Sequence, residues 1–251
     1  MKIIRYSSGG KPEYGILDGN AVRGIAGTPF SRLRATERRY NLADVRLLAP
    51  CTPSKIVALG LNYRAHAAEV KMSAPAEPLI FLKPPTAVIG PEDNIVYPES
   101  SRRVDFEGEL GVVIKTVTRK VSREDALSYI LGYTCFNDVT ARDLQYRDKQ
   151  WTRAKGFDTF AAIGPYIETD LDPDNVLLET RLNGELKQHS STSDLIFPVA
   201  ELVSFASHVM TLLPGDVIAT GTPSGIAPMK PGDTVEVKIE KIGTLRNHVV
   251  Q

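Results

Sequence analysis

Short apolar runs, separated by Gly, Pro and Asp-Gly turns, follow one another along most of this chain, and few stretches have helical periodicity. Strand-length runs bounded by such turns predict β-strands. Helices are too sparse for regular alternation of strand and helix, which argues against a doubly wound parallel sheet. The chain is therefore predicted to be mainly β with some helices, an α+β fold.

Two parts are predicted, in keeping with a length of 251 residues, which suits one large domain with a small appendage. Residues 1–45 form a small N-terminal β-rich domain, and residues 46–251 form the second domain. The strands predicted in the first part are Lys2–Tyr6, Tyr14–Leu17 and Ala21–Arg23. Those predicted in the second part include Ile56–Gly60, Leu79–Leu82, Val217–Thr220 and Thr234–Ile239.

Two helices are predicted in the second domain. Ser122 and Asp125 have the spacing of a capping box, which predicts a helix over Arg123–Leu131. The other helix is predicted over Val199–Leu212. Its inward-facing residues are expected to be Leu202, Phe205 and Val209.

Charge and composition exclude several classes of protein. The 30 Lys and Arg residues balance 30 Asp and Glu residues, and nucleic-acid binding by charge needs a basic excess. No apolar run approaches the ~20 residues that span a membrane, and the N-terminus lacks the apolar core of a signal peptide. Two cysteines, Cys51 and Cys135, are too few for a disulfide framework. We expect a cytoplasmic protein with two reduced thiols, one buried in a strand, and no nucleic-acid or membrane partner.

The most informative segment runs from Val104 to Ile114 and contains Glu-Gly-Glu. Read as a strand, it places Glu107 and Glu109 on one face, about 6.5–7 Å apart at the backbone, so that both side chains can reach one cation. The alternative is a solvated outer face. However, Glu is depleted in strands and like charges side by side repel each other, so two Glu side chains on one strand face need a reason to be there. A bound divalent cation such as Mg²⁺ gives that reason, because it prefers oxygen ligands and offsets the repulsion.

A third acid, Asp138, ends the strand-like run that starts near Tyr133. The alternative for Asp138 is a turn-forming Asn-Asp pair. If Asp138 joins Glu107 and Glu109, three carboxylates leave positions open for water and substrate, as is usual for catalytic Mg²⁺.

His66 and Glu69 are three residues apart on a predicted helical turn, so they face the same way. A carboxylate beside an imidazole orients the ring for acid/base chemistry. The alternative is a surface contact, because such pairs are weak.

Two lysines and one loop have unusual settings. Lys83 ends an apolar strand ahead of Pro84-Pro85, and Lys155 lies before Gly156. Either lysine is a solvated residue or, in an anion site, a group that binds substrate or stabilises an oxyanion. Gly221–Gly225 follows a strand and offers backbone and hydroxyl donors, or it is a plain turn.

Together these segments resemble the fumarylacetoacetate hydrolase family, especially its short members of the acylpyruvase, oxaloacetate decarboxylase and hydroxyhepta-diene-dioate isomerase kind. The resemblance covers nearly all of residues 50–250. The matching segments, in order, are Gly60–Glu69, Ile80–Pro84, Asp105–Val113, Gly132–Gln145, Trp151–Phe157, Leu182–Glu185 and Gly221–Gly225.

The resemblance implies a fold of mixed β-sheets rolled around the site and, commonly, a homodimer. It implies a site with Mg²⁺, or Mn²⁺, held by three acids, a dyad on a segment that closes over the substrate, and substrate contacts. In that reading the metal ligands are Glu107, Glu109 and Asp138, the catalytic residues are His66, Glu69 and Lys155, and the substrate-binding residues include Lys83 and Thr222. Arg64, Arg142 and Gln145 are expected to line the substrate pocket.

Two departures separate this chain from the founding hydrolase: the N-terminal lead-in is only about 45 residues long, and the sequence does not identify the fourth carboxylate ligand that the hydrolase has ahead of its Glu-x-Glu. The chain therefore resembles the short branch.

The leading hypothesis is an enzyme that acts on small anionic 2-oxo or enol carboxylates through a metal-bound enolate, by C–C hydrolysis of an acylpyruvate-type substrate. Isomerisation (tautomerisation) and decarboxylation share the enolate and stay open. A catalytically silent binder of small acids is the alternative from another class.

Overall fold

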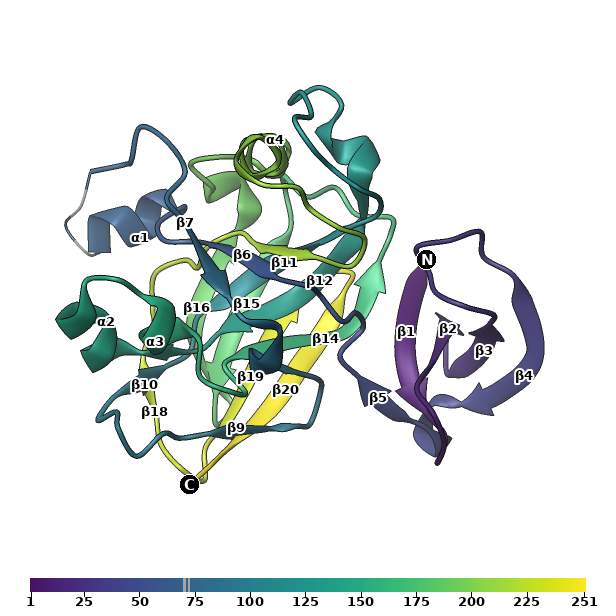
Figure 1. The fold of residues 1–251 in the computed structure, drawn as a ribbon. Coiled ribbons are helices and arrows are strands. Elements are labelled where there is room, and N and C mark those ends of the chain that lie inside the picture. The colour runs from purple at the N-terminus through teal and green to yellow at the C-terminus, as the bar shows by residue number, and fades with distance from the viewer. Residues whose placement is uncertain (70, 72) are drawn as a thin grey trace.

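The structure is a computed structural model that describes residues 1–69, 71 and 73–251. Within these residues the chain is mainly β with some helices, as predicted, and four of the helices are α-helices. The strands form a large sheet of 12 strands and two smaller sheets of five and three strands (Figure 1).

The large sheet has its strands in the order β4 (Ala35–Asn41), β3 (Ala21–Ile25), β2 (Glu13–Asp18), β1 (Lys2–Ser7), β14 (Ala161–Glu168), β12 (Ile130–Asp138), β11 (Gly108–Ile114), β17 (Val217–Ala219), β6 (Ile56–Leu59) and β7 (Ile80–Lys83). Two short strands pair alongside it, β5 (Arg46–Leu48) with β1 and β8 (Val88–Ile89) with β14. The five-stranded sheet has the order β16 (Glu185–Ser191), β15 (Leu177–Leu182), β19 (Thr234–Ile239), β20 (Gly243–Val250) and β9 (Asn94–Val96). The small sheet has the order β13 (Thr140–Ala141), β10 (Val104–Asp105) and β18 (Pro228–Met229). The helices are α1 (Arg64–Glu69), α2 (Arg142–Asp148), α3 (Thr152–Lys155) and α4 (Val199–Val209).

The first 45 residues extend the large sheet. Strands β1–β4 lie to one side of the other elements (Figure 1), and β1 joins them through antiparallel pairing with β14. Strand β5, which follows residue 45, also pairs with β1. The division of the chain at residue 45 stays a prediction.

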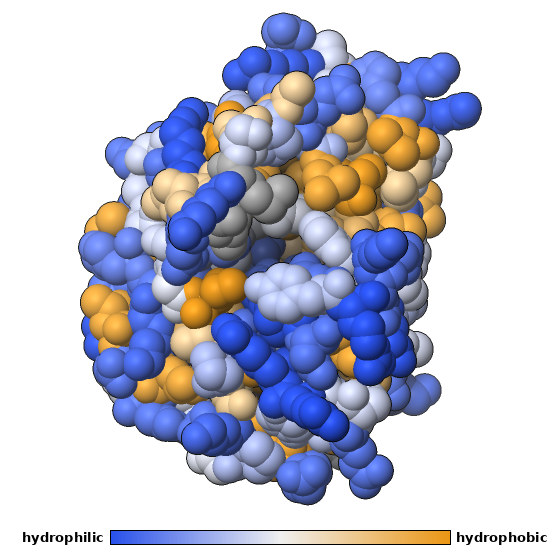
Figure 2. Space-filling model, turned by 90° about the vertical axis from the view of Figure 1, so that its left-hand side faces the viewer, coloured by the Kyte–Doolittle hydropathy of each residue, from blue (hydrophilic) through white to orange (hydrophobic). Residues whose placement is uncertain are grey.

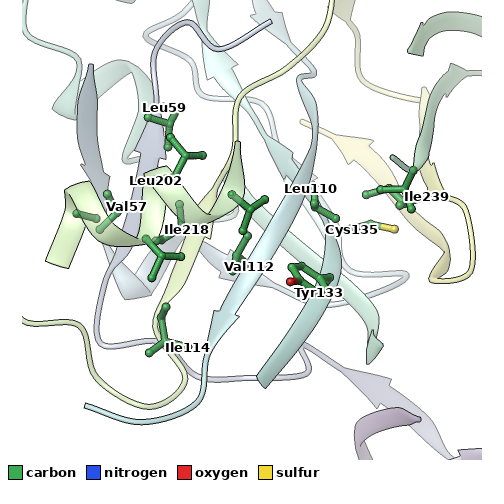
Figure 3. Packing of buried hydrophobic residues seen from close by; sticks show 14 of the residues in the cluster. Val57, Leu59, Leu110, Val112, Ile114, Tyr133, Cys135, Leu202, Ile218 and Ile239 are labelled. Atoms are coloured by element: carbon green, nitrogen blue, oxygen red, sulfur yellow. The ribbon is translucent and has the colours of Figure 1, made fainter. Parts of the chain in front are cut away.

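Strand β11 is central in the large sheet, and all seven of its residues are buried. It pairs with β12 on one side and β17 on the other, and α4 packs over it through Leu202 (Figure 3). Leu110, Val112 and Ile114 point into this core, while Val113 belongs to the core on the other face. A strand covered on both faces reads as a nearly continuous apolar run, and β11 fits except at Glu109.

The predicted helix over Arg123–Leu131 is wrong. A single 3₁₀ turn forms at Ala126–Tyr129, and the chain enters β12 at Ile130. The expected capping contact is present, because the Asp125 amide donates to Ser122 Oγ at 3.2 Å. Cross-strand pairing of Ile130 with Ile114 takes the chain into the sheet and overrides the helical signal.

Helix α4 begins at Val199 as predicted but ends at Val209, not at Leu212. Leu202 is buried and Phe205 is half-buried, whereas Val209, predicted to face inward, is 56% exposed. Leu212 instead exchanges two backbone hydrogen bonds of 2.9 Å with Thr118, so this bridge ends the helix.

Both cysteines are free and buried, and burial raises the pKa of each thiol to about 12. Among the described residues, no helix combines the length and the apolar character needed to cross a membrane.

Asp216, directly before β17, binds groups from two separate segments of the chain, so its removal is expected to destabilise the protein. Its fully buried carboxylate accepts hydrogen bonds from the Ser54 hydroxyl, from the backbone amides of Ser54, Lys55 and Leu213, and from Lys55 Nζ. Burial raises its pKa, but these donors outweigh burial and lower the pKa below its ordinary value. Asp216→Ala is expected to lower the free energy of unfolding by about 3 kcal/mol at pH 7 in urea denaturation.

The lowered pKa also gives this effect a pH dependence. A carboxyl with a depressed folded pKa stabilises the protein above its unfolded pKa, and that contribution disappears as the pH falls through the folded pKa. The difference between wild type and Asp216→Ala should therefore shrink in acid. The exposed Asp158, changed to Ala, serves as the control and should unfold like wild type at every pH.

Candidate active site

The three acids predicted to hold a metal lie together. Glu107 immediately precedes β11, Glu109 is in β11, and Asp138 ends the neighbouring β12. The β11–β12 register places Gly108 opposite Asn137, and the Asp138 amide donates to the Glu107 carbonyl at 2.9 Å. One carboxylate oxygen of each acid lies within 4.8 Å of the others.

Burial excludes the simpler alternatives for these acids. Glu109 and Asp138 are 0% exposed and Glu107 is 6% exposed, so Glu107 and Glu109 do not form a solvated outer face. Asp138 does follow Asn137, but it ends a paired strand in the interior and not a surface turn.

The two lysines singled out in the sequence are also buried, and both contact the acids. Lys155 Nζ donates to Glu107 at 2.8 Å and to Asp138 at 2.7 Å. Lys83 Nζ donates to the other oxygen of Asp138 at 2.5 Å and to the Val139 carbonyl at 3.2 Å. A solvated lysine is therefore excluded at both positions.

A second row of charges surrounds this group. The Arg142 guanidinium, at the start of α2, donates to Glu107, to Asp105 at 2.9 Å and to Gln145 Oε1 at 2.6 Å. Asp105 is fully buried and is also bound by Arg103. Alternating acids and cations thus form one continuous network through the interior.

The network leaves Glu107 and Glu109 in opposite electrostatic settings. Burial alone would raise the pKa of Glu107, but the charges of Lys155 and Arg142 lower it to about 2. For Glu109, burial and the charges of Asp138 and Glu107 raise the pKa well above its ordinary value. Glu109 is therefore the acid of the three that lacks a compensating cation within the described residues.

The donor set fits a hard divalent cation. Glu109 Oε2 accepts from the Gly221 amide at 2.8 Å, but its Oε1 is buried and has no hydrogen-bond partner among the described residues. Buried polar atoms are nearly always paired, so an unpaired carboxylate oxygen beside two more carboxylates calls for a partner. Three carboxylates are a ligand set that Mg²⁺ and Mn²⁺ prefer.

The predicted dyad forms on α1. His66 Nδ1 and Glu69 Oε2 are 2.8 Å apart, and the His66 side chain is 9% exposed. Nε2 of His66 has no hydrogen-bond partner among the described residues.

The Gly221–Gly225 loop joins the dyad to the acids. Its first amide, of Gly221, donates to Glu109, and its last amide, of Gly225, donates to Glu69 Oε1 at 3.1 Å. Both glycines have positive φ, and a Cβ on Gly225 would lie 2.1 Å from the Lys187 carbonyl.

Thr222, within the loop, is buried and donates its hydroxyl to the Gly108 carbonyl at 2.9 Å.

The remaining predicted residues divide. Gln145 is linked to the acids only through Arg142, which donates to Gln145 and to Glu107. Arg64 is exposed on α1, and its guanidinium donates to the Ser193 carbonyl at 3.4 Å, so the structure does not join it to the acids. The catalytic, substrate-binding and metal-binding roles of all these residues stay predictions.

Sequence reasoning missed two buried residues of the site. Asp105 could have been found, because it lies two residues before Glu107 and so continues the same alternation. Gln188, fully buried on β16, contacts Thr222 and Gly108 from the five-stranded sheet. No local pattern around Gln188 indicates this role.

The surface on the side of α1, α2 and α3 is mainly hydrophilic, with smaller hydrophobic patches between (Figure 2).

Comparisons with known proteins identify the family to which this chain is related. Residues 55–250 match the model of the fumarylacetoacetate (FAA) hydrolase C-terminal family, and residues 1–50 match that of the Rv2993c-like N-terminal family. The crystal structure of a 2-hydroxyhepta-2,4-diene-1,7-dioate isomerase from Mycobacterium marinum is 47% identical, with a TM-score of 0.94 over 100% of this chain and 98% of that one.

Two more relatives differ in the activity that they are named for. The mitochondrial oxaloacetate tautomerase FAHD2B of Bos taurus is 42% identical over 83% of this chain and 70% of its own. A maleylpyruvate hydrolase from Sphingobium sp. SYK-6, solved with manganese(II) and pyruvate, is 32% identical, with a TM-score of 0.83 over 100% of this chain and 99% of that one.

Proposed function

Because this chain belongs to the fumarylacetoacetate hydrolase family, we propose that it is a divalent-metal-dependent enzyme that acts on small 2-oxo or enol carboxylates. The observation that carries the proposal is the buried cluster of three carboxylate oxygens within 4.8 Å of one another. The Mn²⁺ and pyruvate bound by the Sphingobium relative support both the class of metal and the class of ligand.

Glu107, Glu109 and Asp138 would hold Mg²⁺ or Mn²⁺. When bound, such an ion supplies Lewis-acid stabilisation of the negative charge that develops on a 2-oxo acid. Lys155 assists from the protein side. Burial lowers its pKa, but the charges of Asp138 and Glu107 raise it overall, which keeps the ammonium group charged beside the site.

Lys83 and Thr222 have more restricted tasks. Lys83 is 0% exposed and donates to Asp138, so it would hold that carboxylate, and its contact with a substrate stays a prediction. The Thr222 hydroxyl donates to the Gly108 carbonyl and accepts from Gln188 Nε2, so both of these hydrogen bonds are made within the protein.

His66 would move the proton. Glu69 holds Nδ1, so Nε2 accepts a proton from the substrate carbon or enol oxygen and returns it to the other position. For hydrolysis the same Nε2 would take the proton of an attacking water. The two reactions therefore use the same side chains.

Proton transfer within the substrate, an isomerase or tautomerase reaction, is the function we favour. The relatives that are named isomerase and tautomerase are 47% and 42% identical, whereas the named hydrolase is 32% identical. C–C hydrolysis of an acylpyruvate, which the sequence alone favoured, is the second candidate, and the hydrolase with bound pyruvate supports it.

An ultraviolet assay with purified protein and Mg²⁺ or Mn²⁺ tests the proposal. Suitable substrates are enol-oxaloacetate, hydroxymuconate-type dienes and acylpyruvates. A change of enol absorbance without pyruvate release indicates isomerisation, and release of pyruvate indicates hydrolysis or, from oxaloacetate, decarboxylation. Tight metal-dependent binding of oxalate with no turnover of any substrate would contradict an enzyme and indicate a binder.

His66→Asn is expected to lower kcat by about 100-fold, the lower end of the usual contribution of a general acid or base. The affinity for Mn²⁺, measured by titration calorimetry, should stay at the wild-type value, because His66 is not among the clustered acids. The exposed His208, changed to Asn, is the control. A variant that retains full kcat would exclude His66 as the proton-transfer group.

A further inference from the structure

Gln188 breaks the pattern of its strand. Among the seven residues of β16 it alone is buried, while Leu186, two positions earlier, is 42% exposed. A strand on a protein core normally turns its apolar residue inward and its amide outward. A polar residue at the one buried position indicates a specific task.

A β-bulge accompanies this inversion. Along the β15–β16 ladder Thr180 pairs with Gln188, but the next residue, Arg181, pairs with Leu186, so Lys187 is the extra residue. A bulge re-aims the side chains that follow it, and bulges occur often beside active sites. Here it accompanies a Gln188 side chain that contacts Gly108, between the two glutamates.

The Gln188 amide closes a ring of hydrogen bonds with Gly108 and Thr222. Its Oε1 accepts from the Gly108 amide at 3.0 Å, and its Nε2 donates to Thr222 Oγ1 at 2.7 Å and to the Pro223 carbonyl at 2.8 Å. Thr222 in turn donates to the Gly108 carbonyl at 2.9 Å. Both backbone groups of Gly108 are thus held by the same ring.

The backbone of Gly108 lies so close to Thr180 and Gln188 that no side chain fits at position 108. A Cβ on Gly108 would lie 2.1 Å from Thr180 Oγ1 and 3.1 Å from Gln188 Oε1. Gly225, whose amide binds Glu69, packs in the same way against Lys187 and Gln188. The bulge of β16 therefore contacts both Gly108, between the two glutamates, and Gly225, in the loop that binds Glu69.

We propose that Gln188 is a positioning residue, which fixes the Gly108 peptide and the Thr222 loop in one arrangement so that Glu107 and Glu109 converge. This inference rests on the proposed metal site. The acids lie in the large sheet or, for Glu107, directly before its strand β11, whereas Gln188 lies in the five-stranded sheet. The inference therefore gives the five-stranded sheet a role in holding the acids in place.

The test compares two buried amides changed to apolar side chains of similar shape. Gln188→Met removes the ring. Asn247→Leu removes a 1%-exposed amide that donates to the Gly90 and Asp93 carbonyls, away from the acids. Both variants should lose thermal stability, but only Gln188→Met should weaken Mn²⁺ binding, by about 10–100-fold in titration calorimetry, the range for loss of an outer-shell partner.

Three results would overturn the inference. The first is a Gln188→Met protein that binds Mn²⁺ like wild type, and the second is an equal loss of affinity in Asn247→Leu. The third is a wild-type protein that binds neither Mn²⁺ nor Mg²⁺, which removes the proposed metal site as well. If Gln188→Met does not fold, Thr222→Val tests the same ring, and unchanged Mn²⁺ affinity in that variant contradicts the inference.

Discussion

Glu109→Gln is expected to reduce Mn²⁺ affinity and turnover by on the order of 10³-fold, more than the 10–100-fold that is typical when an outer-shell partner is lost. Its carboxylate has one hydrogen bond from the protein and one unpaired, buried oxygen, and no cation contacts it among the described residues. A divalent ion is the partner that this environment lacks, so Glu109 should matter most for ion binding.

The same substitution should cost little stability in the absence of a divalent ion. Burial and two neighbouring carboxylates already disfavour the charged form of Glu109, and a glutamine side chain resembles the neutral form. We expect the free energy of unfolding to change by less than about 1 kcal/mol. Titration calorimetry and urea denaturation in a chelator measure the two effects separately.

The half-buried Glu179 on β15, changed to Gln, is the matched control, and it should alter neither quantity strongly. Normal Mn²⁺ affinity in Glu109→Gln would show that the clustered acids serve the fold and not an ion. Large destabilisation without an ion would contradict the electrostatic description of Glu109.

Lys155→Met is expected to lower the free energy of unfolding by about 3–5 kcal/mol, the usual cost of breaking a buried ion pair from one side. Its ammonium group is 2% exposed and is shared by Glu107 and Asp138, so its loss leaves two buried carboxylate oxygens without a partner. Turnover should fall too, because Lys155 is the charge proposed to stabilise the enolate.

Added Mn²⁺ should restore part of this loss. A bound ion neutralises the same carboxylates, so Mn²⁺ should raise the melting temperature of Lys155→Met more than that of wild type. The exposed Lys115, changed to Met, is the control and should stay within about 0.5 kcal/mol of wild type. A Lys155→Met protein as stable as wild type would show that the network around Glu107 contributes no net stability.

The parts of the site that were predictable depend on short sequence separations. Glu107 and Glu109 are two residues apart, and a strand fixes their common face. His66 and Glu69 are three apart, and one helical turn brings them together. Asp138 was predictable because it ends a strand-like run of its own.

The parts that were not predictable depend on contacts between distant segments. Arg142 reaches Asp105 across 37 residues, and Lys83 reaches Asp138 across 55 residues. Gln188 depends on a bulge, which no local spacing announces. The wrong helix over Arg123–Leu131 has the same origin, because pairing with Ile114 is a long-range contact that outweighed a correct local capping signal.

The pairing of β1 with β14 also changes which strand edge meets solvent. Without β1, the end of β14 at Ile167 and Glu168 would present unpaired backbone groups, a template for joining another chain. With the N-terminal strands in place, the outermost strand at that end is β4, which carries Glu37, Arg38 and Arg39. Charged outer strands discourage edge-to-edge association. The lead-in thus ends the sheet on a strand that disfavours such association, whatever the chemistry of the site.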